Sequence, residues 1–187
     1  MKLPIKNWQI YIQCRRSEGS RRELFNLIWN QYQKRIVYFI RNMVKDNVED
    51  LFQDIMLKVY RNLDKYNPLY SFNSWIYSIA RNHCLNFINK NRLPAQSLES
   101  GDESLRSGRE NNSPEVVSIN KELSQKIDNV LNTFNEENRQ VAFLYFYEGL
   151  KNREIAQVMG VPTGTVKSRL HKIREIFKKD LEKYHGY

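Results

Sequence analysis

The sequence predicts an all-α protein: two small helical domains joined by a flexible linker, the C-terminal domain containing a helix-turn-helix. Apolar residues recur at three- and four-residue spacing over 21–92 and again over 119–177, as they do on the buried face of amphipathic helices. Residues 93–118 between them are rich in Ser, Gly, Glu and Asn and have almost no periodic apolar positions. No stretch has the alternation typical of a sheet. We therefore expect domains at 1–92 and 119–187 and a linker at 93–118.

The first domain is expected to hold a short helix near Asn7–Arg15 and three longer ones. Asp46 followed by Glu49 resembles a capping box at the start of the third helix, and Asn67-Pro68 breaks the chain before the fourth, near Ser74–Lys90. The periodic apolar residues are Leu24, Leu27, Ile28, Tyr32, Ile36, Phe39, Ile40 and Met43, then Val48, Leu51, Phe52, Ile55, Val59 and Leu63, then Trp75, Ile76, Ile79, Leu85 and Ile88.

The second domain should begin with two amphipathic helices. The first carries Leu123, Ile127, Val130, Leu131 and Phe134, and the second spans Asn138–Tyr147, with Gly149 as its stop. At about 3.3 Å per residue the preceding 26-residue linker can span up to about 85 Å. Two domains joined in this way can occupy separate positions on one long partner.

Residues 150–177 contain the strongest local pattern, a helix-turn-helix. Gly160 permits the positive φ of a sharp turn between helices, and Pro162 and Thr163 suit the first turn and cap of the next helix. Ile155, Ala156 and Met159 form the inner face of the first helix, and Val166, Leu170, Ile173 and Phe177 form one stripe on the second. The opposite face of the second helix is basic, as expected of a recognition helix in the major groove of DNA.

The charge distribution agrees with a polyanionic partner. The chain carries 30 Lys and Arg against 21 Asp and Glu, a net charge of +9. The excess lies at both ends, with 16 basic and 7 acidic residues in 1–92 and 9 basic and 4 acidic in 149–187. Many soluble proteins are basic, so charge alone does not decide. Its division between the two ends favours two separate contacts with a polyanion such as DNA, RNA or an anionic membrane surface.

Other functional classes find little support. Cys14 and Cys84 stand alone without a CxxC motif, and none of the three histidines has the spacing of a metal site or catalytic triad. There is no phosphate-binding loop and no dinucleotide fingerprint. We expect no enzymatic activity, catalytic residue, metal, cofactor or small-molecule substrate. No apolar run approaches the length of a membrane span, so we expect a cytoplasmic protein without direct membrane insertion.

The helix-turn-helix resembles region 4 of sigma-70 family sigma factors, on the run from Glu154 through Gly160-Val161 to the GTVKSRL of residues 164–170. In that family the domain binds the −35 promoter element. The resemblance implies that Lys167, Ser168, His171 and Lys172 face bases, that Arg153, Arg169 and Arg174 contact phosphates, and that Thr165 belongs to the same interface.

A helix-turn-helix with this TVK run also occurs in LuxR-like response regulators, so a stand-alone transcriptional regulator is the alternative. The first domain favours the sigma factor. Residues 48–55 (VEDLFQDI) and 59–61 (VYR) resemble sigma region 2.2, which docks on the β′ clamp coiled coil of RNA polymerase. Asp50, Gln53 and Asp54 share one exposed helical face by their spacing, and the resemblance makes them the polymerase-binding residues.

Residues 66–68 (YNP) and 72–82 (FNSWIYSIARN) resemble sigma regions 2.3 and 2.4, which capture the −10 element as it melts. The loop of residues 66–72 would supply a pocket for a flipped base. Trp75 either stacks on bases or belongs to the core, and the core is the commoner fate of such a residue. The implied −10 interface consists of Tyr66, Phe72, Trp75, Arg81, Asn82, Asn86 and Lys90.

The resemblance as a whole is to the extracytoplasmic-function (ECF) group, which lacks regions 1.1 and 3 of larger sigma factors. It implies a protein that directs promoter-specific transcription initiation. The implied partners are core RNA polymerase, through its β′ clamp coiled coil and β flap, promoter DNA, and an anti-sigma factor. The first twenty residues and the linker match no pattern that we can interpret.

Overall fold

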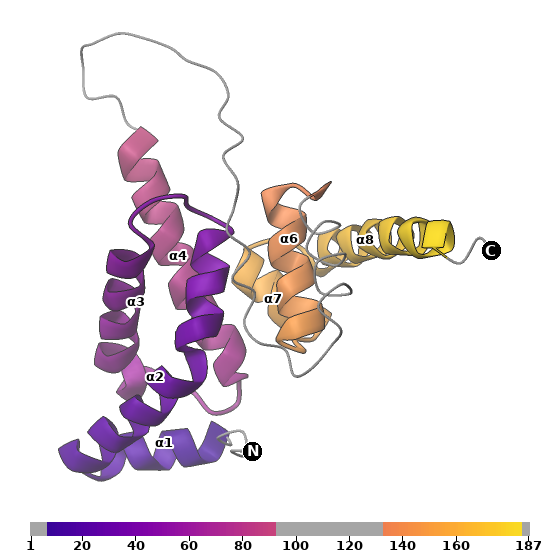
Figure 1. Cartoon of the computed structure of the whole chain (residues 1–187). Helices are drawn as coiled ribbons and strands as arrows, with labels where there is room; N and C mark the ends of the chain where they lie inside the picture. The colour runs from indigo at the N-terminus through magenta and orange to yellow at the C-terminus, as the bar shows by residue number, and fades with distance from the viewer. Residues whose placement is uncertain (1–6, 93–132, 185–187) are drawn as a thin grey trace, which may run out of the picture.

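The structure is a computed structural model that describes residues 7–92 and 133–184, and these residues form helices and short connections without a strand (Figure 1). The predicted linker and most of the predicted helix that ends at Phe134 lie outside the described residues. No helix in the described ranges is both long and apolar enough to cross a bilayer. The helices are α1 (Asn7–Arg16), α2 (Glu18–Arg41), α3 (Val48–Asn62), η1 (Leu63–Lys65), α4 (Phe72–Arg92), α6 (Glu136–Ala142), η2 (Phe143–Tyr147), α7 (Asn152–Met159) and α8 (Thr163–Tyr184).

The N-terminal half, residues 7–92, is built on α2, α3 and α4, and α1 packs against α2 and η1. Ser17 begins α2, its hydroxyl accepting the Ser20 backbone N–H at 3.2 Å. Most of the predicted apolar positions form the core; Trp75, Ile79, Leu85 and Ile88 are partly buried against it, and Leu27 is 40% exposed. Hydrophobic residues exposed by 1% or less here are Ile10, Leu24, Ile28, Ile36, Phe39, Ile40, Ile55, Met56, Val59, Leu63, Tyr66, Ile76, Tyr77, Ala80 and Cys84.

The predicted capping box at Asp46 and Glu49 is wrong. Helix α3 begins at Val48, and the residue before it, Asn47, has φ +59° with no side-chain cap bond. Asn tolerates the left-handed region better than most residues, and here it turns the chain between α2 and α3. The Glu49 carboxylate instead lies 3.7 Å from the Arg41 guanidinium on α2.

The C-terminal half, residues 133–184, begins with a capped helix. The Asn135 side chain accepts the Asn138 N–H at 2.9 Å at the start of α6. The helix predicted over Asn138–Tyr147 is not uniform, because its second part widens into the π-helix η2, a form that is frequent at functional sites. Gly149, with φ +68°, ends it as predicted.

The predicted helix-turn-helix is present as α7 and α8. Gly160 closes α7 with φ +65°, and the Glu154 carboxylate accepts the Lys151 backbone N–H at 2.7 Å. Thr163 is the first residue of α8, and the carbonyl of Pro162 before it accepts the Thr165 N–H at 3.0 Å. Of the predicted stripe, Val166, Leu170 and Ile173 are 0–1% exposed, and Phe177 is partly buried against the core.

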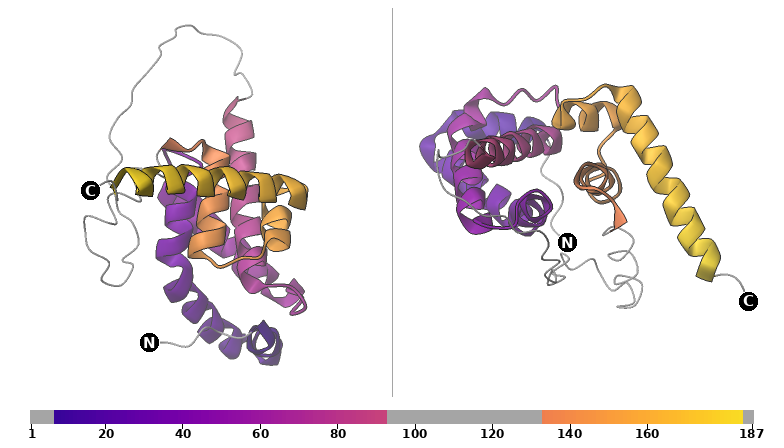
Figure 2. Two further views of the ribbon diagram at one scale, coloured as in Figure 1. Left: turned by 90° about the vertical axis from the view of Figure 1, so that its right-hand side faces the viewer. Right: turned by 90° about the horizontal axis from the view of Figure 1, so that it is seen from above.

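The two halves pack against each other. Helix α4 of the N-terminal half lies against α7 of the C-terminal half, whereas α8 runs outward from the body (Figures 1 and 2). All the described elements are helical, and the predicted fold class is confirmed.

Candidate functional site

The outer face of α8 presents a row of polar and basic side chains. Lys167, Ser168, His171, Lys172 and Arg174 are all exposed, opposite the buried stripe. The Ser168 hydroxyl donates to the Thr165 carbonyl at 2.9 Å, so its oxygen remains able to accept. This arrangement can enter a major groove and present donors to base edges.

The three predicted phosphate-binding arginines differ in exposure and in their contacts. Arg153 on α7 is exposed, but Arg169 is half-buried and forms an ion pair with Glu137. The Arg174 guanidinium donates to the Tyr145 hydroxyl at 3.0 Å and lies 5.3 Å from the centre of that ring. These contacts hold Arg169 and Arg174 in place on the surface around α8.

Helix α4 carries the other predicted DNA face. Asn82, Asn86 and Lys90 are exposed along its second half. Arg81 is half-buried, and burial lowers its pKa; Glu137 opposes this effect and Arg169 adds to it. Arg81 therefore lies close to two charged residues of the C-terminal half.

The loop before α4 rests on an aromatic cluster. The rings of Tyr66, Phe72 and Trp75 have centroids 5.2–5.4 Å apart, and Tyr66 and Phe72 are 1% and 3% exposed. The Tyr66 hydroxyl donates to the Tyr70 carbonyl at 2.7 Å, and burial raises its pKa to about 12.

Tyr66 and Phe72, which the resemblance assigns to the −10 interface, are both buried in this structure. In this arrangement they support the loop, and Trp75 is half-buried against them. The exposed large hydrophobic residues of the loop are Leu69, 80% exposed, and Tyr70, 55% exposed. Sequence reasoning named the loop but not these two residues, because spacing alone does not say which ring of a cluster points outward.

A groove lies between α2 and α3, beside the polar face of α3. Asp50, Gln53 and Asp54 are exposed as predicted, and Gln53 and Asp54 line the groove. Six of its ten other lining residues are apolar or aromatic, including Leu57, 45% exposed. The other lining residues are Arg22, Phe25, Asn26, Trp29, Gln33, Val37, Glu49, Phe52 and Tyr60.

Sequence reasoning missed the α2 side of this groove. Phe25 and Trp29 are one helical turn apart, next to the core stripe, and their spacing could have identified a second apolar face. Trp29 packs edge-on against Phe52 of α3, with ring centroids 4.8 Å apart. Aromatic rings from both helices therefore form the sides of the groove.

His83 of α4 connects to the polar face of α3. Its Nε2 lies 3.4 Å from the Asp54 carboxylate, and its Nδ1 lies 2.6 Å from Nζ of Lys58. Burial lowers the His83 pKa, the Lys58 charge lowers it further, and Asp54 opposes both. His83 therefore lies beside Asp54 mainly as a neutral ring near neutral pH.

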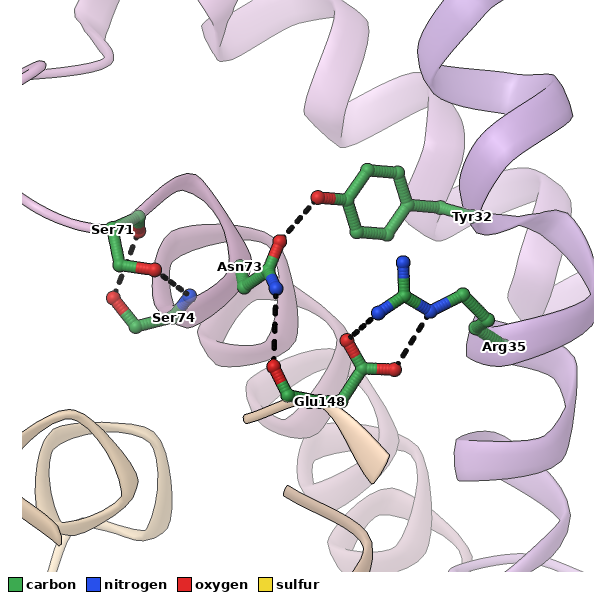
Figure 3. Close-up of polar contacts among 6 residues, drawn as sticks. All are labelled: Tyr32, Arg35, Ser71, Asn73, Ser74 and Glu148. Carbon is green, nitrogen blue, oxygen red and sulfur yellow. Dashed lines mark hydrogen bonds and ion pairs between the residues drawn. The ribbon is translucent and has the colours of Figure 1, made fainter. Parts of the chain in front are cut away.

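A polar cluster joins the two halves (Figure 3). Glu148, at the end of η2, receives two bonds from Arg35 of α2, one of them from Nε at 2.8 Å, and its side chain is fully buried. Asn73, near the start of α4, donates to the Glu148 carbonyl at 3.5 Å and accepts from the Tyr32 hydroxyl. Ser74, 1% exposed, donates to the Ser71 carbonyl at 2.9 Å and steadies that end of α4.

Family models of known proteins match both halves of the chain. Residues 28–93 match the family model of sigma-70 region 2, and residues 124–176 match that of sigma-70 region 4. The chain belongs to the sigma-70 family. The region 2 match favours the sigma factor over the alternative, a stand-alone LuxR-like regulator.

Curated relatives place this sigma factor in the ECF group. It is 30% identical over 167 residues to the ECF RNA polymerase sigma-E factor of Escherichia coli K12, covering 86% of this chain and 87% of that protein. It is 26% identical over 174 residues to the sigma-E factor of Haemophilus influenzae, covering 89% and 92%.

Two solved structures share the fold at low identity. One is CnrH in complex with the cytosolic domain of CnrY, with a TM-score of 0.58 and 15% identity, covering 95% of this chain and 97% of that one. The other is the sigma factor RpoE of Bartonella quintana in complex with the anti-sigma factor NepR, with a TM-score of 0.58 and 20% identity, covering 84% and 96%.

Proposed function

We propose that this ECF sigma factor binds core RNA polymerase through the α2–α3 groove and reads promoter DNA with α4 and α8. One observation supports the proposal. The same chain exposes, on α3, the face that resembles the polymerase-binding part of sigma factors and, on α8, a polar and basic face suited to reading DNA. We also propose that its domains are residues 1–92 and 119–187, with 93–118 as the linker.

The groove fits a helical partner. An apolar channel between two helices accepts the apolar side of a third helix, and the β′ clamp coiled coil supplies such a helix. Glu49 and Asp54 line the groove on the α3 side, opposite Arg22 of α2, and the exposed Asp50 lies beside them on α3. These three acidic residues would favour a basic partner on the α3 side. Trp29 and Leu57 would provide the apolar contact, because large rings and exposed leucines gain most from burial.

The two proposed DNA-binding faces would contact different elements of the promoter. Helix α8 would read the −35 element with Lys167, Ser168, His171 and Lys172, while Arg153, Thr165, Arg169 and Arg174 would lie along the backbone. The −10 element would meet Asn82, Asn86, Lys90 and Arg81, with the exposed Tyr70 as a stacking surface. Trp75 would contribute only after it is uncovered, and Tyr66 and Phe72 would support the loop.

The remaining assignments follow from the family. We propose that the protein acts in the cytoplasm, that it performs no covalent chemistry, and that the β flap is a second contact on polymerase. An anti-sigma factor is a further proposed partner, supported by the likeness of the fold to a sigma factor crystallised with such a protein.

Run-off transcription with core polymerase and a library of templates tests the function directly. The full chain should confer transcripts from a defined subset of promoters and bind duplex DNA weakly by itself. If no promoter-specific transcript appears while the protein alone footprints a duplex, the sigma-factor assignment is wrong.

Lys172→Ala tests the −35 face. Loss of a base contact costs about 1–3 kcal/mol at one position of the element and relaxes the preference there. Lys179→Ala, two turns further along the same side of α8, removes the same charge beyond the predicted base contacts. Selection from a randomised −35 library should show a changed preference for Lys172→Ala only. An equal loss on all sequences would assign Lys172 to phosphate instead.

A further inference from the structure

Asp54 and Lys58 of α3 have the spacing of a helical ion pair but do not form one. An acidic residue followed by a basic residue four positions later pairs readily along the surface of a helix. Here the Lys58 ammonium lies 2.6 Å from Nδ1 of His83 on α4, and among the described residues no ion pair joins it to Asp54. The Asp54 carboxylate, 65% exposed, therefore borders the groove without an ammonium group bonded to it.

The contact with Lys58 determines which nitrogen of the His83 ring carries the hydrogen. An ammonium group can only donate, so Nδ1 must present its lone pair, and the hydrogen of the neutral ring is then on Nε2. That nitrogen lies 3.4 Å from the Asp54 carboxylate and is otherwise buried without a hydrogen-bond partner. A buried N–H seldom stays unpaired, and Asp54 is an acceptor within reach. The ring therefore bridges Lys58 and Asp54.

Protonation of His83 would reverse both contacts. An imidazolium donates from both nitrogens, so it cannot accept from Lys58, and the two cations would repel each other. Lys58 would be released toward Asp54, and Nε2 would become a charged donor to the same carboxylate. Among the described residues, Lys58 and Asp54 are the charged groups that act on the ring, and burial together with Lys58 lowers its pKa below 6.5. The neutral bridge is therefore the form present near neutral pH.

We propose that His83 is a positioning residue for polymerase binding, which holds Lys58 away from Asp54 and so keeps the Asp54 carboxylate available to a basic partner in the groove. A cation paired with Asp54 would weaken the attraction between this face and such a partner. Binding should therefore weaken as the pH falls and His83 takes up a proton. The bridge rests on the observed contacts, whereas its effect on polymerase rests on the proposed function.

Titration of the His83 ring in the full-length protein, followed by NMR, tests the bridge without polymerase. His83→Asn identifies its signal among the three histidines. Lys58→Met should raise the His83 pKa, because it removes a charge that lowers it, and Asp54→Asn should lower it. Lys65→Met removes an exposed charge on η1 and is the matched control, which should leave the titration in place. An unchanged titration in both α3 variants overturns the bridge.

The affinity for core RNA polymerase tests the consequence. His83→Ala should weaken binding about threefold at neutral pH, because the released Lys58 can then pair with Asp54 as an exposed ion pair. His83→Asn should keep the affinity, since its amide oxygen takes the place of Nδ1 and accepts from Lys58. Fluorescence anisotropy of labelled protein measures the binding, and far-UV circular dichroism checks that each variant keeps its helices. An undiminished affinity of folded His83→Ala overturns the positioning role.

A double variant separates the capture of Lys58 from a purely structural role of the ring. If Lys58 causes the loss, Lys58→Met in the His83→Ala background should restore the affinity of the unaltered protein, a non-additive result expected of groups in contact. Lys65→Met in the same background removes the same charge elsewhere and should restore nothing. A loss that persists in the folded His83→Ala, Lys58→Met protein overturns the positioning role.

A pH profile provides a readout that a structural role would not change. Between about pH 7 and about pH 5, the affinity of the unaltered protein should fall about threefold relative to that of His83→Asn, whose side chain does not titrate in this range. The ratio of the two affinities removes the titration of polymerase itself, because both proteins bind the same core enzyme. A ratio that stays constant across this range contradicts the proposal.

Failure of the proposed function would give a different pattern. If the His83 titration responds to Lys58→Met and Asp54→Asn but the unaltered protein neither binds core polymerase nor yields a promoter-specific transcript, the bridge stands and the sigma-factor assignment is wrong. Binding and transcription that do not respond to His83→Ala at any pH would leave the assignment intact and reject the positioning role.

Discussion

Helix α2 has two faces that differ in whether another part of the chain covers them. The face toward α3 carries Phe25 and Trp29 and borders an open groove, whereas the face toward α4 carries Tyr32, Arg35 and Phe39 and is covered by region 4. Both faces are rich in aromatic residues. The first still has apolar surface to bury, and the second has already buried it within the same chain.

The difference shows how one small domain serves two kinds of contact. Burial of apolar area contributes roughly 25 cal/mol per Å², so an open aromatic groove favours a partner from outside. On the covered face the same driving force is already used by Phe143, and an ion pair adds specificity. A polymerase subunit can therefore bind the open face while region 4 remains docked on the other.

The largest effect should come from the covered face. Phe143→Ala removes a buried ring and should lower the free energy of unfolding by about 3–5 kcal/mol. Urea denaturation followed by circular dichroism measures this loss. Phe146→Ala is the matched control in the same π-helix, since Phe146 is 55% exposed, and it should cost about 1 kcal/mol or less. Equal losses for both would mean that the covered face adds nothing.

On the open face, Asp54→Arg should weaken binding to core polymerase by about 1–3 kcal/mol, because it reverses a charge at the groove rim while leaving the fold intact. Fluorescence anisotropy of labelled protein titrated with core enzyme gives the affinity. Asp46→Arg makes the same change on the exposed turn before α3, outside the groove lining, and should alter the affinity little. Unchanged binding by Asp54→Arg would show that polymerase docks elsewhere.

The smallest effect concerns His83, which supports the open face from behind. Its pKa in the folded protein is lowered from 6.5, first by burial, so the unfolded chain binds the proton more readily. The stability that neutral His83 contributes is present above pH 6.5 and is lost as the pH falls below it.

His83→Gln should therefore flatten the fall in unfolding free energy between pH 7 and pH 5 by less than about 1 kcal/mol. His171→Gln, at an exposed position on α8, should leave that profile unchanged. Thermal unfolding across this pH range provides the measurement, and parallel profiles for His83→Gln and the unaltered protein would contradict the assignment.

Much of this sigma factor follows from its sequence. Apolar periodicity predicts the helices and which side of α3 and α8 faces solvent, because local spacing determines which side chains share a face. The glycines predict the turns between helices, because they permit a positive φ. The family motifs then predict the kind of partner for each exposed face. Local spacing went wrong at Asp46, where one residue in the left-handed region moved the helix start.

Only the tertiary structure decided which surfaces meet. Arg35 and Glu148 are 113 residues apart, and no periodicity pairs them. The burial of Tyr66 and Phe72, the rings that wall the groove and the docking of Phe143 have the same origin. A sequence pattern shows that a face is apolar, but which other apolar face covers it depends on close packing between distant elements.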